Sequence, residues 1–286
     1  MPQDTFETAY EKKGYLEDNF RVFHLTDRAK KEYTFHYHDF AKILVLLSGD
    51  VSYTIEGRTY KLSPYDIVLV DAGQIHRPVV HSEYPYERII LYVSPSYLRS
   101  LQEEQYDLSL CFQKAKEEHT NVLRISSFER SLLCDCCRKL SLSLQDHDYA
   151  CKLHHTLLFL EFLIQLNRAV LHNDIQYIEM KSSNGKILSV LDYISEHLTE
   201  DISPDSIADT FYLNKYYLMH LFKEETGYTL GSYITNKRLL LARDLLKSGL
   251  PATQVCYDCG FKNYSTFSRA YRKCFQATPR ELIRSR

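Results

Sequence analysis

The sequence predicts an α+β protein, with strands in its N-terminal part and helices in its C-terminal part. Three observations lead to this prediction. Short runs rich in β-branched residues recur between residues 20 and 94. Leucines at helical spacing follow from about residue 95. Two segments near the C-terminus then share one plan, which is a short helix, a turn and a second helix.

Four apolar runs carry the strand prediction. The runs KILVLLSG, DIVLVDAG and ERIILYVS are β-branched and end in turn residues. The run VSYTIEGRTYKL alternates on both sides of Glu56-Gly57, which indicates a hairpin. Several short strands at this spacing are typical of a sandwich or a small barrel. We therefore expect a barrel-like domain in this part of the chain.

Two leucine-rich segments follow, FERSLLCDCCRKLSLSL and YACKLHHTLLFLEFLIQLNRAVL. In the second, one helical face carries a leucine stripe, made of Leu153, Leu157, Leu160 and Ile164. One interpretation is that both helices cover the barrel. The other is that the stripe also contacts a second copy of the protein, so that residues from about 128 to 172 form a helical dimerisation segment.

A polar segment, LHNDIQYIEMKSSNGK, separates this region from the C-terminal helices. Its Ser-Ser-Asn-Gly sequence is typical of a linker. A chain of 286 residues is long enough for two domains. We therefore divide it into a sensing and dimerisation domain over residues 1–172, a linker over 173–186 and a helical domain over 187–286.

The C-terminal helices have clear boundary signals. Ser203 precedes a proline and should cap one helix. Asn214 should cap the next helix, which Gly227 should end. A longer helix is predicted over GSYITNKRLLLARDLLKSG. Thr278 and Glu281 have the spacing of a capping box.

The two repeated segments read as helix-turn-helix motifs, in which the second helix lies in the major groove of DNA. Each second helix has an apolar face and an opposite face of polar, aromatic and basic residues. Small hydroxyls and arginine suit phosphate and base-edge contacts. A single such face is usually just solvated, but two matched ones favour DNA. The predicted DNA-binding residues are Tyr216, Met219, His220 and Lys223 in the first motif, and Tyr264, Ser265, Ser268, Arg269 and Arg272 in the second.

The charge distribution agrees with a polyanionic partner for the C-terminal part. Residues 1–185 carry 21 Lys and Arg against 26 Asp and Glu, a balance of −5. Residues 202–286 carry 13 against 7, a balance of +6. No apolar signal stretch is visible at the N-terminus, and the most apolar run, TLLFLEFLIQL, is too short to cross a bilayer. We therefore expect a cytoplasmic protein.

Residues from about 187 to 286 closely resemble the DNA-binding domain of AraC/XylS-type bacterial transcription regulators. The segment VCYDCGFKNYSTFSRAYRKCFQATPRELI carries the resemblance through its G-F pair, its Ser-rich stretch, the aromatic and Arg residues after it, and the late T-P. Gln276-Ala277 stands where the family commonly has Gly. The resemblance implies a regulator that binds double-stranded promoter DNA, and activation is more common than repression in the family.

The cysteines allow a metal or redox interpretation. Cys256 and Cys259 form a C-x-x-C, but in the family pattern they take apolar positions that should face the core. Only Cys274, His197 and His220 could complete a zinc site, and their spacing matches no zinc knuckle. A redox role for the CDCC sequence is the alternative to thiols packed as small apolar groups.

The N-terminal part contains a second candidate site. His36 and His38 should point to one face of a strand, and His76 follows later. They resemble the cupin barrel that many of these regulators carry as a sensor. Enzymatic cupins complete a metal site with a Glu, where this chain has Lys42. We therefore expect neither metal nor cofactor. Ordinary hydrogen-bonded barrel residues are one alternative; we prefer a ligand site of His36, His38, Tyr53, His76 and Arg77, with Tyr37 as a further candidate.

Together these features predict a cupin-like β-barrel with a helical dimerisation segment, followed by an all-α domain with two helix-turn-helix motifs. The function expected is that of a transcription regulator, not an enzyme, that responds to a small polar effector, for which a sugar is a family-level expectation. A homodimer is expected, with RNA polymerase as a possible partner. One alternative is a metal-dependent cupin enzyme with a fused helical domain, which the missing Glu disfavours. Another is a protein-binding scaffold, which the basic balance disfavours.

Overall fold

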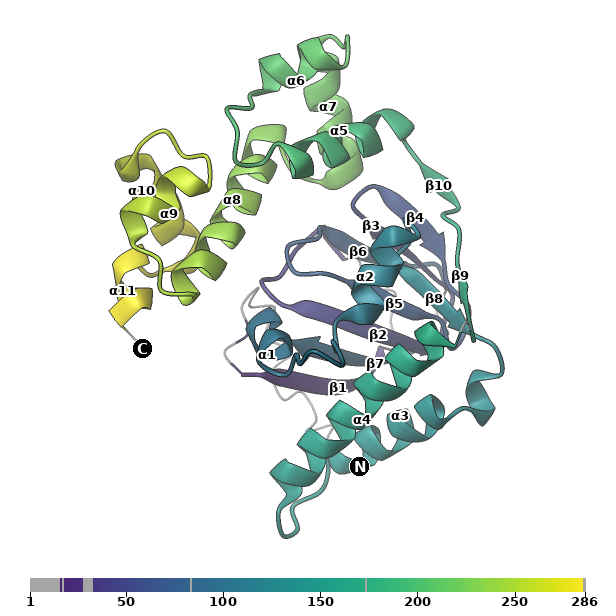
Figure 1. Ribbon diagram of the computed structural model, residues 1–286. Helices are drawn as coiled ribbons and strands as arrows, with labels where there is room; N and C mark the ends of the chain where they lie inside the picture. Colours follow the sequence, from purple (N-terminus) through teal and green to yellow (C-terminus); the bar gives the residue numbers. More distant parts are fainter. Residues whose placement is uncertain (1–15, 17, 28–32, 83, 173, 285–286) are drawn as a thin grey trace, which may run out of the picture. The chain divides into compact units, whose positions relative to one another are not determined.

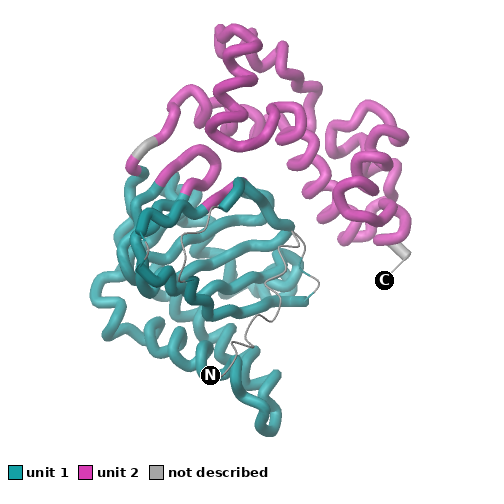
Figure 2. The backbone as a smooth tube through the Cα atoms, turned by 180° about the vertical axis from the view of Figure 1, so that it is seen from behind, with its two compact units in different colours: residues 1–53, 60–74, 78–180 teal, residues 54–59, 75–77, 181–286 magenta. Residues whose placement is uncertain are grey.

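The structure is a computed structural model that describes residues 16, 18–27, 33–82, 84–172 and 174–284. The chain forms two compact units (Figure 2). The N-terminal unit comprises residues 1–53, 60–74 and 78–180. The C-terminal unit comprises residues 54–59, 75–77 and 181–286. Two short segments from the first third of the chain therefore belong to the C-terminal unit.

The larger of two sheets has six strands in the order β1-β7-β2-β5-β8-β9, and adjacent strands run antiparallel. The predicted apolar runs form β2, β5 and β7. In the centre of the sheet, Lys42 on β2 lies opposite Tyr92 on β7 and Val70 on β5. The strands are β1 (Phe20–Asp27), β2 (Ala41–Ser48), β5 (Ile67–Val70), β7 (Tyr86–Val93), β8 (Val122–Ile125) and β9 (Ile175–Tyr177).

The smaller sheet has the order β10-β4-β3-β6. It contains β3 (Val51–Ile55), β4 (Arg58–Lys61), β6 (His76–Val80) and β10 (Ser182–Ser183). The predicted hairpin turn is confirmed, because Glu56 and Gly57 have φ angles of 44° and 73°. The segment predicted as a linker, 173–186, contains β9 and β10. Polar residues are suited to this role because both strands lie at sheet edges, where side chains remain in contact with water.

Helices cover one face of the six-stranded sheet (Figure 1). Alternate residues of β2, namely Ala41, Ile43 and Val45, share a core with α3 and α4, which pack side by side. The intervening residues of β2 therefore point to the other face of the sheet. The helical segments of this unit are α1 (Pro95–Ser100), α2 (Leu110–Glu117), η1 (Phe128–Arg130), α3 (Leu132–Ser143) and α4 (Cys151–Leu171).

The predicted boundaries of the C-terminal helices are confirmed. Ser203 accepts a hydrogen bond from the Ser206 amide, and Asn214 caps the following helix. Gly227 ends that helix with φ 76°. Thr278 and Glu281 form the capping box. The helices are α5 (Gly185–Glu196), α6 (Pro204–Thr210), α7 (Lys215–Thr226), α8 (Leu230–Lys247), α9 (Ala252–Asp258), α10 (Tyr264–Phe275) and α11 (Pro279–Arg284).

Helix α8 contributes to the cores of both helix-turn-helix motifs. Near its start, Tyr233 contacts Phe222 of α7, with ring centroids 5.3 Å apart. Towards its end, Leu239 and Leu246 share a core with α9 and α10. Its 18 residues span about 27 Å at 1.5 Å per residue. The helix therefore acts as a spacer between the two motifs.

A glycine lies where the second motif meets the loop before α6. Gly260 has φ 79°, and a Cβ atom there would lie 2.7 Å from the carbonyl oxygen of Thr199. Arg238 of α8 binds the same loop by donating to the carbonyls of Leu198, at 2.8 Å, and Glu200, at 2.6 Å. Only glycine fits both the backbone angle and this close approach.

Candidate nucleic-acid interface and ligand-binding site

Helices α6 and α7 form the first helix-turn-helix motif. Leu218 and Phe222 of α7 are fully buried, so the face that carries them points to the core. Asn214 fixes the start of α7 by accepting hydrogen bonds from two backbone amides. The predicted DNA-binding residues lie on the other face and are all exposed: Tyr216, Met219, His220 and Lys223.

Helices α9 and α10 form the second motif, with Phe267 and Tyr271 buried. Asn263 caps α10 by accepting a 2.8 Å hydrogen bond from the Thr266 amide. Nε of Arg269 donates to the Ser265 carbonyl, one turn back, at 3.3 Å. Tyr264 packs partly against the core, so it is less available than predicted. Ser265, Arg269 and Arg272 are exposed, and Tyr264 and Ser268 are half-buried.

These two surfaces have the chemistry of a DNA reader. Guanidinium, ammonium and hydroxyl groups donate to phosphates and to base edges, and α7 and α10 present them on exposed helical faces. Sequence reasoning missed two exposed residues just before these helices, Tyr212 and Lys262. Their position immediately before the second helix of each motif could have identified them, because recognition helices approach base edges with their N-terminal ends.

The C-x-x-C sequence belongs to the core, as predicted. Cys256 and Cys259 are fully buried, and burial raises the pKa of both thiols, that of Cys259 to about 12. Thiols held protonated in this way are poor metal ligands and nucleophiles. Within the described part of the chain, no cysteine joins a group of three potential metal ligands. In the CDCC sequence, burial likewise raises the pKa of Cys136 to about 11.

Two of the predicted ligand-binding residues come together near the start of β2. The rings of His36 and His38 have centroids 5.0 Å apart. The third histidine, His76, is the first residue of β6 and is fully buried. The Gly73 amide donates to the His38 carbonyl at 2.7 Å, which holds the loop before β6 against this segment.

Tyr53 lies deeper and is paired with Lys42. The Lys42 Nζ donates to the fully buried Tyr53 hydroxyl at 2.9 Å. Burial, assisted by the charge of Arg88, lowers the pKa of Lys42 to about 7. Burial, followed by the charge of Lys42 and then that of His36, lowers the pKa of His38 to about 2. The interior thus holds a neutral imidazole beside a weakly basic amine.

Arg77 follows His76 on β6 and differs from it in burial. Successive residues on a strand point to opposite faces, and burial alternates along β6. His76 is fully buried, whereas its neighbour Arg77 is half-buried. Tyr37, between the two histidines, is half-buried as well.

The imidazoles of the predicted site are groups that bind transition metals. The cupin pattern adds a carboxylate to them, whereas this chain supplies the ammonium of Lys42. Burial lowers the pKa of His38 most, and the charge of Lys42 lowers it further, so that charge acts directly on one of these rings. A cation opposes a bound metal, and the donor set therefore does not fit one.

In the described part of the chain, no helix is long and apolar enough to span a membrane.

Two family models match the chain. Residues 21–156 match the AraC-like ligand binding domain, which covers the strands from β1 to β8 and reaches into α4. Residues 207–285 match a helix-turn-helix domain, which covers both motifs and the α8 spacer.

Similar proteins include the HTH-type transcriptional activator RhaS of Shigella sonnei (strain Ss046), with 24% identity over 255 residues, 88% of this chain and 87% of RhaS. RhaS of Escherichia coli (strain SMS-3-5 / SECEC) is 23% identical with the same coverage. Among solved structures, ToxT from Vibrio cholerae aligns over 93% of this chain and 98% of its own, with 16% identity and a TM-score of 0.37. The C-terminal domain of AraT, a response regulator from Geobacillus stearothermophilus, aligns over 36% and 87%, with 26% identity and a TM-score of 0.35.

Proposed function

Because the chain belongs to the AraC family of transcription regulators with an N-terminal sensor domain, we propose that it activates promoters in response to a small polar effector. The observation that carries the proposal is the pair of exposed faces on α7 and α10, each set by a buried face and a side-chain cap. The similar RhaS proteins are named as transcriptional activators, which supports activation for this chain.

The two motifs read successive major grooves on one face of the duplex. Helix α8 spans about 27 Å, and grooves recur every ~34 Å, so one spacer of this length suits two readers. Arg269 reads a base, because a guanidinium can bind guanine through two hydrogen bonds. Lys223 and Arg272 contact phosphates, and Tyr216, Met219, His220, Tyr264, Ser265 and Ser268 complete the interface.

The effector binds in the N-terminal sensor domain at His36, His38, Tyr53 and His76. A cluster of imidazole and phenol groups can orient the hydroxyls of a polar ligand such as a sugar. The enzyme alternative would need a metal, and the ammonium of Lys42 disfavours one. The protein therefore acts as a regulator without catalysis, in the cytoplasm, where it can reach DNA and RNA polymerase.

Two copies associate through the leucine stripe of α4. Three of its four residues are exposed, whereas Leu160 packs partly against the core. Leu153 is 61% exposed, Leu157 57% and Ile164 39%, and Leu160 is half-buried. An exposed apolar stripe of this kind suits a symmetric contact between identical helices. The residues of α4 that cover the sheet are Leu158, Phe159, Phe162, Leu163, Leu166 and Val170.

We assign these roles to the three segments of the chain. Residues 1–172 sense the effector and dimerise, residues 173–186 connect, and residues 187–286 bind DNA. Footprinting on the promoters that flank the gene tests the proposal directly. A protected region that spans two major grooves supports it. If the purified protein, with or without candidate effectors, protects no promoter above its non-specific background, the proposal fails.

A further inference from the structure

Lys42 is a charged residue in the interior of the sensor domain. It lies on the central strand β2, is 2% exposed, and stands between Tyr92 on β7 and Val70 on β5. Its neighbours Ala41 and Ile43 point to the helix-covered face of the sheet. The Lys42 side chain therefore points away from that face, towards the smaller sheet, where it meets Tyr53 on β3.

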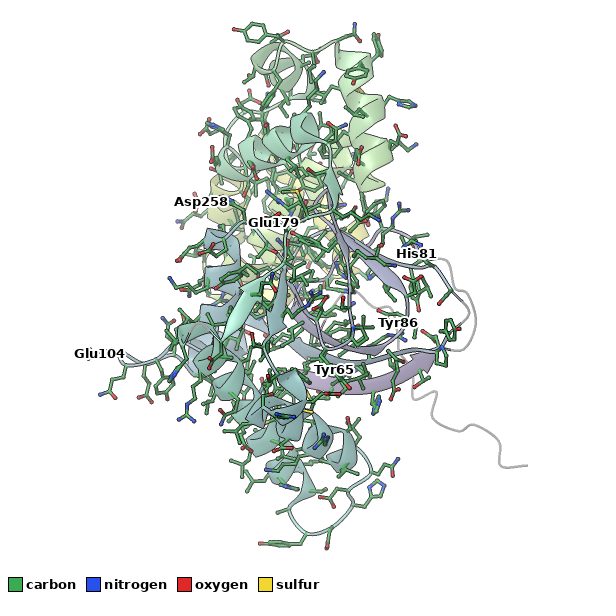
Figure 3. All side chains as sticks on the ribbon, turned by 90° about the vertical axis from the view of Figure 1, so that its right-hand side faces the viewer. Tyr65, His81, Tyr86, Glu104, Glu179 and Asp258 are labelled. Carbon is green, nitrogen blue, oxygen red and sulfur yellow. The ribbon has the colours of Figure 1, made fainter. Side chains whose placement is uncertain are left out.

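The second buried cation nearby, Arg88, has its charge balanced within the protein. Its Nη2 lies 2.7 Å from an Asp27 oxygen, and its Nη1 donates to the Tyr86 carbonyl at 2.9 Å. The guanidinium also lies 4.0 Å from the ring centroid of Tyr86, which Figure 3 labels. Arg88 thus forms a structural ion pair with Asp27, and the Asp27 carboxylate is already engaged in that pair.

Lys42 has no such balance. Its one hydrogen-bond acceptor is the neutral Tyr53 hydroxyl, and no carboxylate of the described residues lies within 4.0 Å of its Nζ. A charge buried without a counter-ion is unfavourable, so proteins keep one mainly where something else compensates it. Burial, assisted by the charge of Arg88, lowers the pKa of Lys42 to about 7, so the charged form of this amine is disfavoured where it lies.

Three buried rings, those of His38, Phe40 and Tyr92, pack on one another beside this ammonium, and we call them the aromatic surface. His38 stacks on Phe40 with ring centroids 4.4 Å apart, and Phe40 contacts Tyr92 at 4.3 Å. His38 and Tyr92 are 5.7 Å apart. These rings can pack against the flat, apolar side of a small molecule whose charged end lies at Lys42.

We propose that the effector of this protein is a small organic carboxylate, and that Lys42 Nζ forms the ion pair that recognises it. The inference deepens the proposed sensor function and rests on it. A neutral sugar would leave the ammonium without a counter-ion, whereas a carboxylate supplies one and also accepts from the Tyr53 hydroxyl. The aromatic surface then distinguishes acids that carry a ring from those that do not.

The test uses two pairs of matched probes with the full-length protein. Glucuronate is compared with glucose, and phenylacetate with 2-phenylethanol, by thermal shift and calorimetry at pH 6.5. At least one acid should bind, and more tightly than its neutral partner. Lys42→Met should weaken that binding by roughly 30-fold or more, as expected for loss of one partner of a desolvated ion pair. Lys116→Met, at an exposed position on α2, is the matched control and should bind like the wild type.

The inference is overturned if no acid binds more tightly than its neutral partner, or if Lys42→Met binds the acids as well as the wild type does. Circular dichroism confirms that the variants are folded, and Tyr53→Phe provides a second, smaller perturbation of the same site. Promoter binding by the wild-type protein is measured in parallel. Its absence contradicts the proposed function, whereas failure of the carboxylate probes with promoter binding intact contradicts the effector class alone.

Discussion

The carboxylate of Glu56 accepts a 2.8 Å hydrogen bond from the Tyr233 hydroxyl, and both side chains are buried. The same carboxylate lies 2.7 Å from Lys237 Nζ and accepts from the Ile75 amide at 3.0 Å. Glu56 stands in the β3–β4 turn, whereas Tyr233 and Lys237 are on α8. All of these residues belong to the C-terminal unit, so one carboxylate joins a turn and two segments distant in sequence within that unit.

Replacement of Glu56 by Ala should therefore be strongly destabilising. It leaves the Tyr233 hydroxyl and the Lys237 ammonium without their acceptor, at a cost of about 3 kcal/mol in the free energy of unfolding. The surface pair of Tyr65 and Glu129, 3.0 Å apart and exposed, is the matched control. Glu129→Ala should change stability by less than about 0.5 kcal/mol. If urea denaturation shows that both variants lose the same free energy of unfolding, then burial of the Glu56 cluster does not increase its contribution to stability.

Arg269→Ala should reduce promoter affinity and relax specificity at one base pair. The loss of a two-point contact to guanine costs about 1–3 kcal/mol against the preferred base and less against the others. Titrations against single-base operator variants measure this difference. Arg138→Ala is the matched control. It removes an arginine side chain from the exposed surface of α3, which is distant in sequence from α10, and should leave the promoter affinity unchanged. Full discrimination by Arg269→Ala would mean that α10 does not read bases.

Lys223→Ala should weaken binding on every sequence by a similar factor. A phosphate contact releases a counter-ion, so its loss should reduce the slope of log affinity against log salt by about 1. Arg272→Ala should behave in the same way. The measurement is a salt series by fluorescence anisotropy on specific and random duplexes. An effect confined to the specific duplex would instead make the residue a base reader.

Lys42 should make stability depend on pH. Its pKa is about 7 in the folded protein and near 10.5 when unperturbed, so the unfolded chain binds more protons between these values. Its contribution therefore destabilises by roughly 5 kcal/mol below pH 7, and this destabilisation fades as the pH rises towards 10.5. Among the described residues, the titratable and charged groups that face it are His38, Tyr53, Arg88 and Tyr92.

The comparison with Lys42→Met isolates this contribution. The variant should be more stable than the wild type at pH 6, and the difference should shrink by pH 9, as measured by urea denaturation at each pH. A carboxylate ligand should also take up a proton when it binds the wild type at pH 8, because it favours the charged amine. Calorimetry in buffers of different ionisation enthalpy detects that proton. If the difference in stability between the variant and the wild type does not change with pH, the lowered pKa of Lys42 is contradicted.

Protein purified without chelator should contain far less than one transition metal ion per chain. The reason is the ammonium of Lys42 beside the ring of His38. Elemental analysis by plasma mass spectrometry makes the measurement, with His36→Ala as the comparison. A metal content near one per chain that is lost in this variant would refute the prediction.

Leu157→Glu should yield a monomer. The residue is 57% exposed in the middle of the leucine stripe, so the change affects a surface contact and leaves the core intact. Light scattering at micromolar concentration measures the mass, and Gln165→Glu, at a half-buried position on α4, adds the same charge outside the stripe. A wild-type protein that is monomeric with and without DNA would rule out this interface.

The parts of the fold that depend on local sequence were predictable. Asn214 and Ser203 cap helices through amides two or three residues away, so their chemistry is visible in the sequence. The Glu56-Gly57 turn is equally local. The direction of the α4 stripe was not predictable in the same way. That helix is apolar on most of its surface, and periodicity alone cannot say which apolar face meets the sheet.

In the candidate sites, too, the features that depend on local sequence were predictable and the contacts between distant segments were not. The outward faces of α7 and α10 follow from helical spacing, although the structure leaves Tyr264 and Ser268 half-buried. The pairing of Lys42 with Tyr53 joins strands of two different sheets and has no signature in the sequence. The bond between Glu56 and Tyr233 spans 177 positions and could not be inferred from either residue.

The contact between Gly260 and the Thr199 carbonyl limits how this regulator can evolve. A side chain at position 260 would collide with main-chain atoms, so no point substitution there can widen the junction by a small step and keep the fold. The separation of the two readers is thereby inherited unchanged, while the exposed residues of α7 and α10 can vary one at a time. Descendants of this gene should acquire new operators by altering which bases are preferred, and retain the ancestral distance between half-sites.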